Sequence, residues 1–210
     1  MPSAFLREIP GPQGPLEALL DVPAGEPRAA AVIAHPHPQF GGTMHTKVVY
    51  QAAKALCRIG CAVLRVNFRG AGASAGSFDN GPGEMDDFGA ALDFMHAEYP
   101  AAPMWVAGMS FGAWVALSVG GEDPRVSTLI GIALPISRYD FGAVERSTKP
   151  KFFIHGEFDE LFPLKTMREF YARAAEPKEL IVIDAADHLF DGRVHEVADA
   201  LEDLLEDWSV

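Results

Sequence analysis

The chain has 210 residues, of which 49% are hydrophobic and 22% charged, and this balance excludes a largely disordered protein. Its formal net charge of -12 argues against nucleic acid or an anionic membrane surface as a partner, because both need a basic face. Two cysteines, Cys57 and Cys61, are too few for a disulfide framework, and we expect small buried thiols rather than metal ligands. The length suits one domain over residues 1–210.

Targeting segments are not evident in the sequence. No run approaches the roughly 18 consecutive apolar residues that a membrane-spanning helix needs. The first residues, MPSAFLREIPGPQGPLEALL, lack a basic start followed by an apolar stretch and a small-residue cleavage site. We therefore expect a cytoplasmic protein.

The chain begins with two strand-like segments, Phe5–Ile9 and Leu16–Asp21, on either side of a turn rich in proline and glycine. Apolar strands and helical patterns then alternate. In chain order these are strand Ala29–Ala34, helix Thr46–Ile59, strand Ala62–Asn67, helix Glu84–Tyr99, strand Met104–Ala107, helix Phe111–Val119, strands Ser127–Ala133 and Lys151–His155, helix Leu164–Ala174, strand Glu179–Ile183 and helix Val194–Trp208.

This alternation predicts the α/β class, with a mostly parallel central sheet and helices on both faces. The strands are continuous apolar runs, as expected where both faces of a sheet are covered. Functional groups in such sheets gather beyond the carboxyl ends of the strands. Reactive side chains should therefore directly follow strands.

Gly108-Met109-Ser110-Phe111-Gly112 fits the pattern G-x-S-x-G between a predicted strand and a predicted helix. A serine on so tight a turn has a strained backbone, and side chains two residues before and after it would collide with neighbouring elements. The following helix directs its N-terminal N–H groups at the same place. Ser110 is thus a candidate nucleophile.

A nucleophilic serine needs a base, and the base needs an orienting carboxylate. Asp159 lies in the loop after the strand Lys151–His155, and His188 lies in the loop after the strand that ends at Ile183. We predict Ser110, Asp159 and His188 as the catalytic residues. Other candidates in these regions are Glu157, Glu160 and Asp187 for the acid and His195 for the base.

The loop from His35 to Gly42 follows the first long parallel strand, where a second oxyanion donor should lie. The first donor would be the backbone N–H of Phe111. Pro36 and Pro38 have no N–H, which leaves His37, Gln39 or Phe40, and we favour His37. The three histidines of residues 35–45 have no carboxylate or cysteine at ligand spacing, so we expect no metal there.

Together these motifs resemble the α/β-hydrolase superfamily, and more closely its small lidless serine hydrolases. The matching segments are His35 to Gly42, Asn67-Phe68-Arg69-Gly70 and Asp187-His188. The resemblance implies esterase-like hydrolysis without a cofactor, with Ser110 as nucleophile, His188 as base and Asp159 as orienting acid.

The segment Ala133 to Lys151 is too short for the helical cap that many relatives insert there. We therefore expect an open site for small-molecule esters with small or protruding acyl groups. Candidates for the substrate pocket are Gln39, Phe40, Met44, Met109, Phe111, Phe141 and Leu189, although each could be a core residue. Arg69 could bind a substrate carboxylate, but pairing with Glu84, Asp86 or Asp87 is favoured.

The triad does not identify the bond that is cleaved, because esterases, thioesterases, amidases and peptidases use the same groups. A peptidase would need a site for a protonated amine, and no acidic pair for it is evident. A non-catalytic binding module of the same fold is the alternative outside enzymes. Such modules typically lose a triad residue or an elbow glycine, and neither is lost here.

Overall fold

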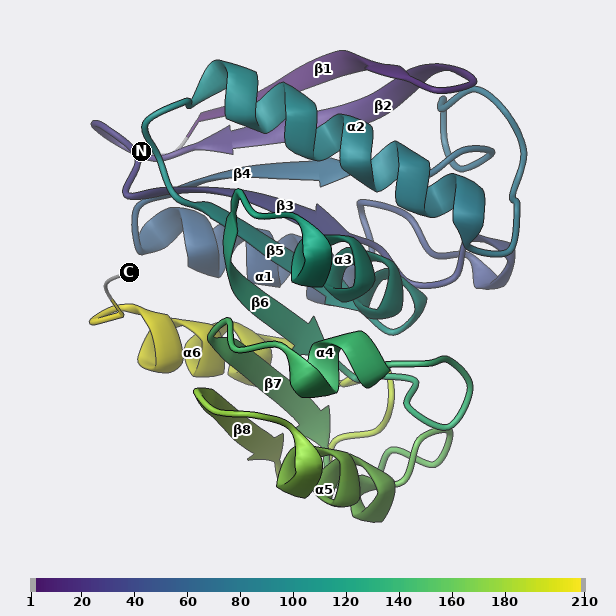
Figure 1. Ribbon diagram of the computed structural model, residues 1–210, viewed down its shortest axis with the longest axis vertical. Coiled ribbons are helices and arrows are strands. Elements are labelled where there is room, and N and C mark those ends of the chain that lie inside the picture. The colour runs from purple at the N-terminus through teal and green to yellow at the C-terminus, as the bar shows by residue number, and fades with distance from the viewer. Residues whose placement is uncertain (1–2, 209–210) are drawn as a thin grey trace.

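The computed structural model describes residues 3–208. Their strands form one eight-stranded sheet in the order β1-β2-β4-β3-β5-β6-β7-β8, which Figure 1 shows as one continuous layer. The first two strands form an antiparallel hairpin, β2 pairs antiparallel with β4, and all later pairs are parallel. The strands are β1 (Ser3–Gly11), β2 (Gly14–Val22), β3 (Ala29–Ala34), β4 (Cys61–Val66), β5 (Met104–Met109), β6 (Val126–Ile132), β7 (Lys151–Gly156) and β8 (Lys178–Ile183).

Helices cover both faces of this sheet (Figure 1). On one face α2, α3, α4 and α5 pack against the sheet, and on the other α1 and α6 lie side by side. The helices are α1 (Lys47–Arg58), α2 (Pro82–Glu98), α3 (Phe111–Glu122), α4 (Gly142–Arg146), α5 (Leu164–Arg173) and α6 (Val194–Leu205), with a short 3-10 helix η1 (Pro38–Phe40). The predicted fold class, an α/β-hydrolase fold with helices on both faces, is confirmed.

The apolar strands supply both layers of the core. Along β4, Leu64 and Val66 face the layer under α2 and α3, whereas Cys61 and Val63 face the layer under α1 and α6. Side chains of a strand alternate between its faces, so burial of both faces requires an unbroken apolar run. Both cysteines are buried free thiols, as the sequence predicted.

The expected elements are confirmed with small shifts at their ends. The N-terminal strands are longer than predicted, because a two-residue turn allows pairing as far as Gly11 and Gly14. The last helix ends at Leu205 rather than at Trp208. The sequence did not predict η1. Within the described part of the chain, no helix has both the length and the hydropathy needed to cross a membrane.

The connection from β6 to β7 contains only the five-residue helix α4. No cap therefore covers the carboxyl end of the sheet within residues 133–150. This lidless arrangement leaves the loops after β3, β5, β6, β7 and β8 to shape whatever site lies there.

Candidate active site

Ser110 occupies the turn between β5 and α3 with a strained backbone, φ 52° and ψ −121°. Its N–H donates to the carbonyl of Ile132, 2.9 Å away. A Cβ at Gly108 would lie 2.3 Å from the carbonyl oxygen of Gly112, and one at Gly112 would lie 2.3 Å from that of His35. Both glycines of the elbow are thus sterically required, as the sequence predicted.

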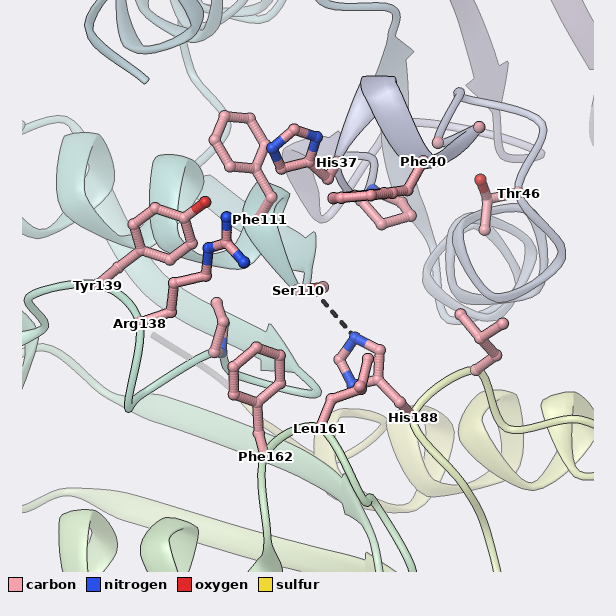
Figure 2. A pocket seen from close by; sticks show the side chains of 15 residues that line it. His37, Phe40, Thr46, Ser110, Phe111, Arg138, Tyr139, Leu161, Phe162 and His188 are labelled. Atoms are coloured by element: carbon pink, nitrogen blue, oxygen red, sulfur yellow. Dashed lines mark hydrogen bonds between the residues drawn. The ribbon is translucent and has the colours of Figure 1, made fainter. Parts of the chain in front are cut away.

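The side chains of Ser110, His188 and Asp159 form one hydrogen-bonded chain. The Nε2 atom of His188 lies 3.0 Å from Oγ of Ser110, and its Nδ1 atom lies 2.7 Å from Oδ2 of Asp159. Figure 2 shows the Ser110–His188 contact at the floor of a cavity. The three residues are 9%, 8% and 3% exposed. Residues far apart in sequence therefore meet at the carboxyl ends of β5, β7 and β8.

Asp159 is held in place by its own loop. Its Oδ1 accepts hydrogen bonds from the N–H groups of Leu161 and Phe162, at 3.0 and 2.8 Å. Burial alone would raise the pKa of Asp159, but the hydrogen bonds from His188 and Phe162 outweigh it, so this pKa lies below its usual value. The carboxylate is therefore ionised at neutral pH and can orient the His188 ring.

The other residues considered for these roles lie elsewhere. Glu157 accepts a hydrogen bond from the N–H of Ala185, and Asp187 accepts those of Leu189 and Asp191. Glu160 and His195 are exposed. The buried His155 lies beneath the acid, with Nε2 2.8 Å from the Phe162 carbonyl and 3.7 Å from Asp159.

Within the described chain, the loops after β3 and β5 each contain a backbone N–H group without a hydrogen-bond partner. Among residues 3–208, neither the N–H of Phe111 nor that of His37 has a hydrogen-bond partner. The other two candidate donors are already hydrogen-bonded. The N–H of Gln39 donates to Nδ1 of His37, and the N–H of Phe40 donates to the carbonyl of His37. A Cβ at Gly42 would lie 2.0 Å from the Pro36 carbonyl, so the loop could not fold this way with another residue there.

The buried His35 fixes the start of this loop. Its Nδ1 lies 2.6 Å from the carbonyl of Pro36, and its Nε2 accepts the N–H of Phe68. These contacts require the tautomer with the proton on Nδ1. Burial lowers the pKa of His35 to about 4, so the ring is neutral at physiological pH.

Ser110 and His188 open into a cavity of about 500 Å³ with mostly apolar walls. Several of its side chains remain open to solvent, with Phe40 81%, Leu161 60% and Leu189 57% exposed. The lining residues follow β3, β5, β6, β7 and β8, and Figure 2 shows their side chains around the serine. The lining residues are Pro36, His37, Phe40, Gly41, Gly42, Thr46, Ser110, Phe111, Pro135, Arg138, Tyr139, Leu161, Phe162, His188 and Leu189.

The predicted pocket residues divide into two groups. Phe40, Phe111 and Leu189 line the cavity. Gln39 is exposed outside it, and Met44, Met109 and Phe141 are buried core residues that do not reach it. The α/β pattern could not separate these groups, because an apolar residue near a strand end suits a core and a pocket equally well.

The sequence reasoning missed the wall formed by the loops after β6 and β7. Pro135, Arg138, Tyr139, Leu161 and Phe162 line the cavity there. The rule that functional groups follow strand ends could have found them, since both segments directly follow strands.

Arg69 lies away from the cavity and pairs with Asp87. Its Nη2 is 2.8 Å from Oδ1 and its Nε is 3.0 Å from Oδ2, and both side chains are buried. The favoured structural role is confirmed. Across residues 3–208, no group of three or more His, Cys, Asp or Glu side chains is arranged to hold a metal ion.

The fold and its resemblances define the class of protein as a lidless α/β serine hydrolase. The model of a family described as serine aminopeptidase, S33, matches residues 25–139, more than half of the chain. The chain belongs to this hydrolase family.

Individual relatives match over nearly the whole chain. An uncharacterised protein of Rickettsia prowazekii is 35% identical over 98% of this chain and 89% of its own. The structure of an α/β serine hydrolase homologue from Coxiella burnetii is 36% identical, with a TM-score of 0.90 over 97% of each chain. An α/β serine hydrolase without lid from Xanthomonas campestris is 33% identical, with a TM-score of 0.91 over 98% of this chain and 95% of that one.

Proposed function

We propose that the protein hydrolyses carboxylic esters of small molecules through a Ser110–His188–Asp159 triad. The observation that carries the proposal is the hydrogen-bonded chain of these three side chains, with 3.0 and 2.7 Å contacts, at the floor of an apolar cavity. A serine hydroxyl, a neutral imidazole and an ionised carboxylate in series are the parts that acyl transfer needs.

The proposed cycle has two halves. The hydroxyl of Ser110 attacks the ester carbonyl while Nε2 of His188 takes its proton, and His188 returns that proton to the departing alcohol. Asp159 holds the Nδ1–H tautomer and stabilises the imidazolium. Water, activated by the same imidazole, then attacks the acyl-serine and releases the acid. The strained serine backbone holds Ser110 at the top of the turn, where it lines the cavity.

The oxyanion of the tetrahedral intermediate would lie between the two loops after β3 and β5. The unpartnered N–H groups of Phe111 and His37 support this role. Because these donors are fixed before the reaction, no reorganisation energy is spent when the charge forms, and each contributes about 10²–10³ in rate.

The cavity supports small apolar esters rather than lipid droplets. Its walls are mostly aromatic and aliphatic, and no cap closes over it within the described chain. Soluble short-chain esters can enter without interfacial activation. Faster turnover of emulsified long-chain triglyceride than of a soluble short-chain ester would contradict this preference.

The family description, serine aminopeptidase, raises a second candidate function. An aminopeptidase binds a protonated amine next to the scissile amide, and a carboxylate is the natural partner for that charge. None of the described residues lining the cavity is Asp or Glu. The charge of the cavity wall therefore favours esters over aminoacyl amides.

The test compares a p-nitrophenyl ester of a short acyl chain with an aminoacyl p-nitroanilide, on the wild type and on Ser110→Ala. We expect rapid ester hydrolysis, slow or no anilide hydrolysis, and loss of both in the variant with its fold retained. Wild-type ester turnover that persists in Ser110→Ala would overturn the proposal. Preference for the anilide would select the peptidase.

A further inference from the structure

The cavity carries one kind of charge only. Among its described lining residues there is no carboxylate, and Arg138 is the only arginine or lysine. The whole chain has a net charge of -12, so its overall field repels anions. The wall of the candidate active site therefore differs in sign from the chain as a whole, because its arginine is positively charged and no carboxylate accompanies it among the described lining residues.

The backbone of Arg138 is fixed by the loop after β6. Its N–H donates to the Pro135 carbonyl at 3.0 Å, and the N–H of Tyr139 reaches the same oxygen at 3.2 Å. Figure 2 shows the guanidinium directed into the cavity, between Tyr139 and Ser110. It lies 5.8 Å from the centre of the Tyr139 ring, within reach of a cation–π contact.

The charge of Arg138 also acts on the proposed oxyanion loop. The pKa of His37 is lowered, first by burial and then by repulsion from Arg138. Arg138, His37 and Ser110 line the same cavity, so this charge borders the space that a substrate would enter.

No protein carboxylate neutralises Arg138 within residues 3–208. The adjacent Asp140 instead accepts the N–H of Gly142 at 2.8 Å. The buried or partly buried Arg65, Arg69 and Arg125 each pair with an aspartate. Arg138 is exposed and, like the exposed Arg146 and Arg168, has no ion pair within residues 3–208, but it alone of these three lines the cavity. No carboxylate of the described chain therefore competes for the bidentate donor set that this guanidinium presents to the cavity.

We propose that Arg138 recognises a negatively charged group on the substrate, so that the enzyme prefers apolar or aromatic esters that also bear a carboxylate. The proposal rests on the proposed ester hydrolysis and specifies its substrate class. The aromatic rings of Phe40, Phe111 and Tyr139 would contact the apolar body, and Arg138 would pair with the anion.

The test uses pairs of aryl esters that differ only in charge. One pair carries the charge on the alcohol, meta-acetoxybenzoate against meta-acetoxybenzamide. The other carries it on the acyl group, the monophenyl ester of terephthalate against phenyl para-carbamoylbenzoate. Values of kcat/KM, divided by the rate of alkaline hydrolysis of each ester, remove the intrinsic reactivity difference.

For at least one pair we expect the wild type to prefer the anion about tenfold, as for a hydrogen-bonded charge pair. Arg138→Gln should abolish this preference, so that the normalised rates of the charged and neutral esters become equal within about a factor of two. Arg138→Lys should retain part of it. Arg168→Gln is the matched control, because this arginine is exposed on α5 and does not line the cavity, so the preference should persist.

Equal wild-type rates for both members of both pairs, or a preference that survives Arg138→Gln, would overturn the proposal. Binding of naphthalene carboxylate and of its carboxamide, measured by calorimetry, separates this failure from failure of the ester hydrolysis. Tighter binding of the carboxylate that depends on Arg138, without turnover of any ester, would support the anion site and reject the proposed reaction. Equal binding of the carboxylate and the carboxamide, together with normal ester turnover, would reject the anion site and support the proposed reaction.

Discussion

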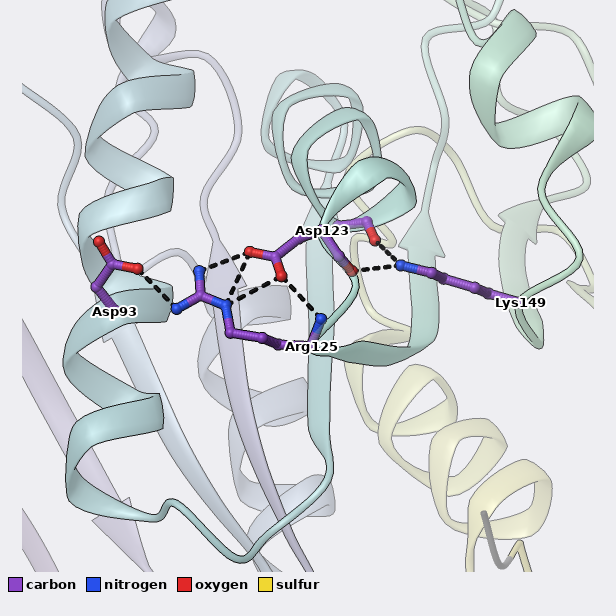
Figure 3. A network of polar contacts seen from close by, with 5 residues as sticks. Asp93, Asp123, Arg125 and Lys149 are labelled. Atoms are coloured by element: carbon purple, nitrogen blue, oxygen red, sulfur yellow. Dashed lines mark hydrogen bonds and ion pairs between the residues drawn. The ribbon is translucent and has the colours of Figure 1, made fainter.

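The two ends of the sheet use their polar groups in opposite ways. Figure 3 shows the amino-terminal end, where Arg125, just before β6, pairs with Asp93 of α2 at 2.7 Å and with Asp123 at 2.6 Å. Lys149, just before β7, donates to the carbonyls of Gly120 and Asp123 at 2.8 and 2.5 Å, which caps the end of α3. All four of these charged side chains, or the residues that carry them, have protein partners.

At the carboxyl-terminal end, hydrogen-bonding capacity is left open. Within the described chain the N–H groups of Phe111 and His37 have no acceptor, and Arg138 has no ion pair. Ser110 also keeps a strained backbone there. Saturated groups stabilise the fold, whereas unsaturated and strained groups cost stability and persist where a ligand uses them. The contrast predicts that substitutions of the unsaturated groups at the carboxyl-terminal end change activity, whereas substitutions at the amino-terminal end change stability alone.

The largest effect should come from Asp159→Asn. The amide cannot hold the Nδ1–H tautomer of His188, so kcat/KM for an ester should fall about 10⁴-fold. Circular dichroism should show an unchanged fold. Glu160→Gln is the control, because within the described chain the side chain of this exposed neighbour has no hydrogen bond or ion pair to a triad residue. A drop of similar size in the control would mean that the loop, and not the carboxylate, matters.

The next effect tests the backbone donor of the oxyanion loop. His37 has φ −52°, close to the value of proline. His37→Pro therefore removes the unpartnered N–H without a large change in φ, and His37→Ala removes the ring but keeps the N–H. We expect kcat of the proline variant to lie about 10²–10³-fold below that of the alanine variant. Equal kcat values in the two folded variants would reject His37 as a donor.

A smaller effect is expected at His35, which we expect to affect the free energy of unfolding rather than the chemical step. Burial lowers its pKa from 6.5 to about 4, so the unfolded chain takes up the proton first as the pH falls. The stabilisation is therefore complete above pH 6.5 and is lost progressively towards pH 4, up to about 3 kcal/mol.

Chemical denaturation of wild type and His35→Gln across this pH range measures that loss. The variant should have a flatter profile, and His195→Gln, an exposed histidine on α6, should follow the wild type. If wild type and His35→Gln lose the same free energy of unfolding between pH 6.5 and 4, the buried neutral imidazole does not contribute to the loss of stability in acid.

The smallest effect is expected at the amino-terminal end. Arg125→Met breaks pairs whose side chains are partly exposed, with Arg125 32% and Asp93 71% accessible, so solvent screening limits the loss to about 1 kcal/mol of unfolding free energy. The ester kcat/KM should remain at the wild-type value. A fall in activity beyond the loss of folded protein would show that the two ends are not independent.

The sequence alone predicted much of this arrangement, because the groups involved follow strict local rules. The apolar strands require burial on two faces, and the glycines around Ser110 allow only one kind of turn. Since parallel strands end at one edge, Asp159 and His188 could be assigned to the same place without knowledge of any distance.

The pocket wall was harder to predict, because no periodicity separates wall from core. Met44, Met109 and Phe141 are apolar residues near strand ends, as Phe40 and Leu189 are, yet three of these five side chains point into the core. The residues around Arg138 in the sequence also gave no indication that it would line the cavity. Its position on the cavity wall without an ion pair among residues 3–208 is a property of tertiary packing.

The most direct test of the account is to find which residue a fluorophosphonate modifies. Intact-mass analysis of the labelled wild type, followed by peptide mapping, should show one adduct, on Ser110, and none in Ser110→Ala. Labelling should be slowed by a short-chain ester that competes for the same serine. A folded wild type that takes up no label, or carries it on another residue, would contradict the proposed nucleophile.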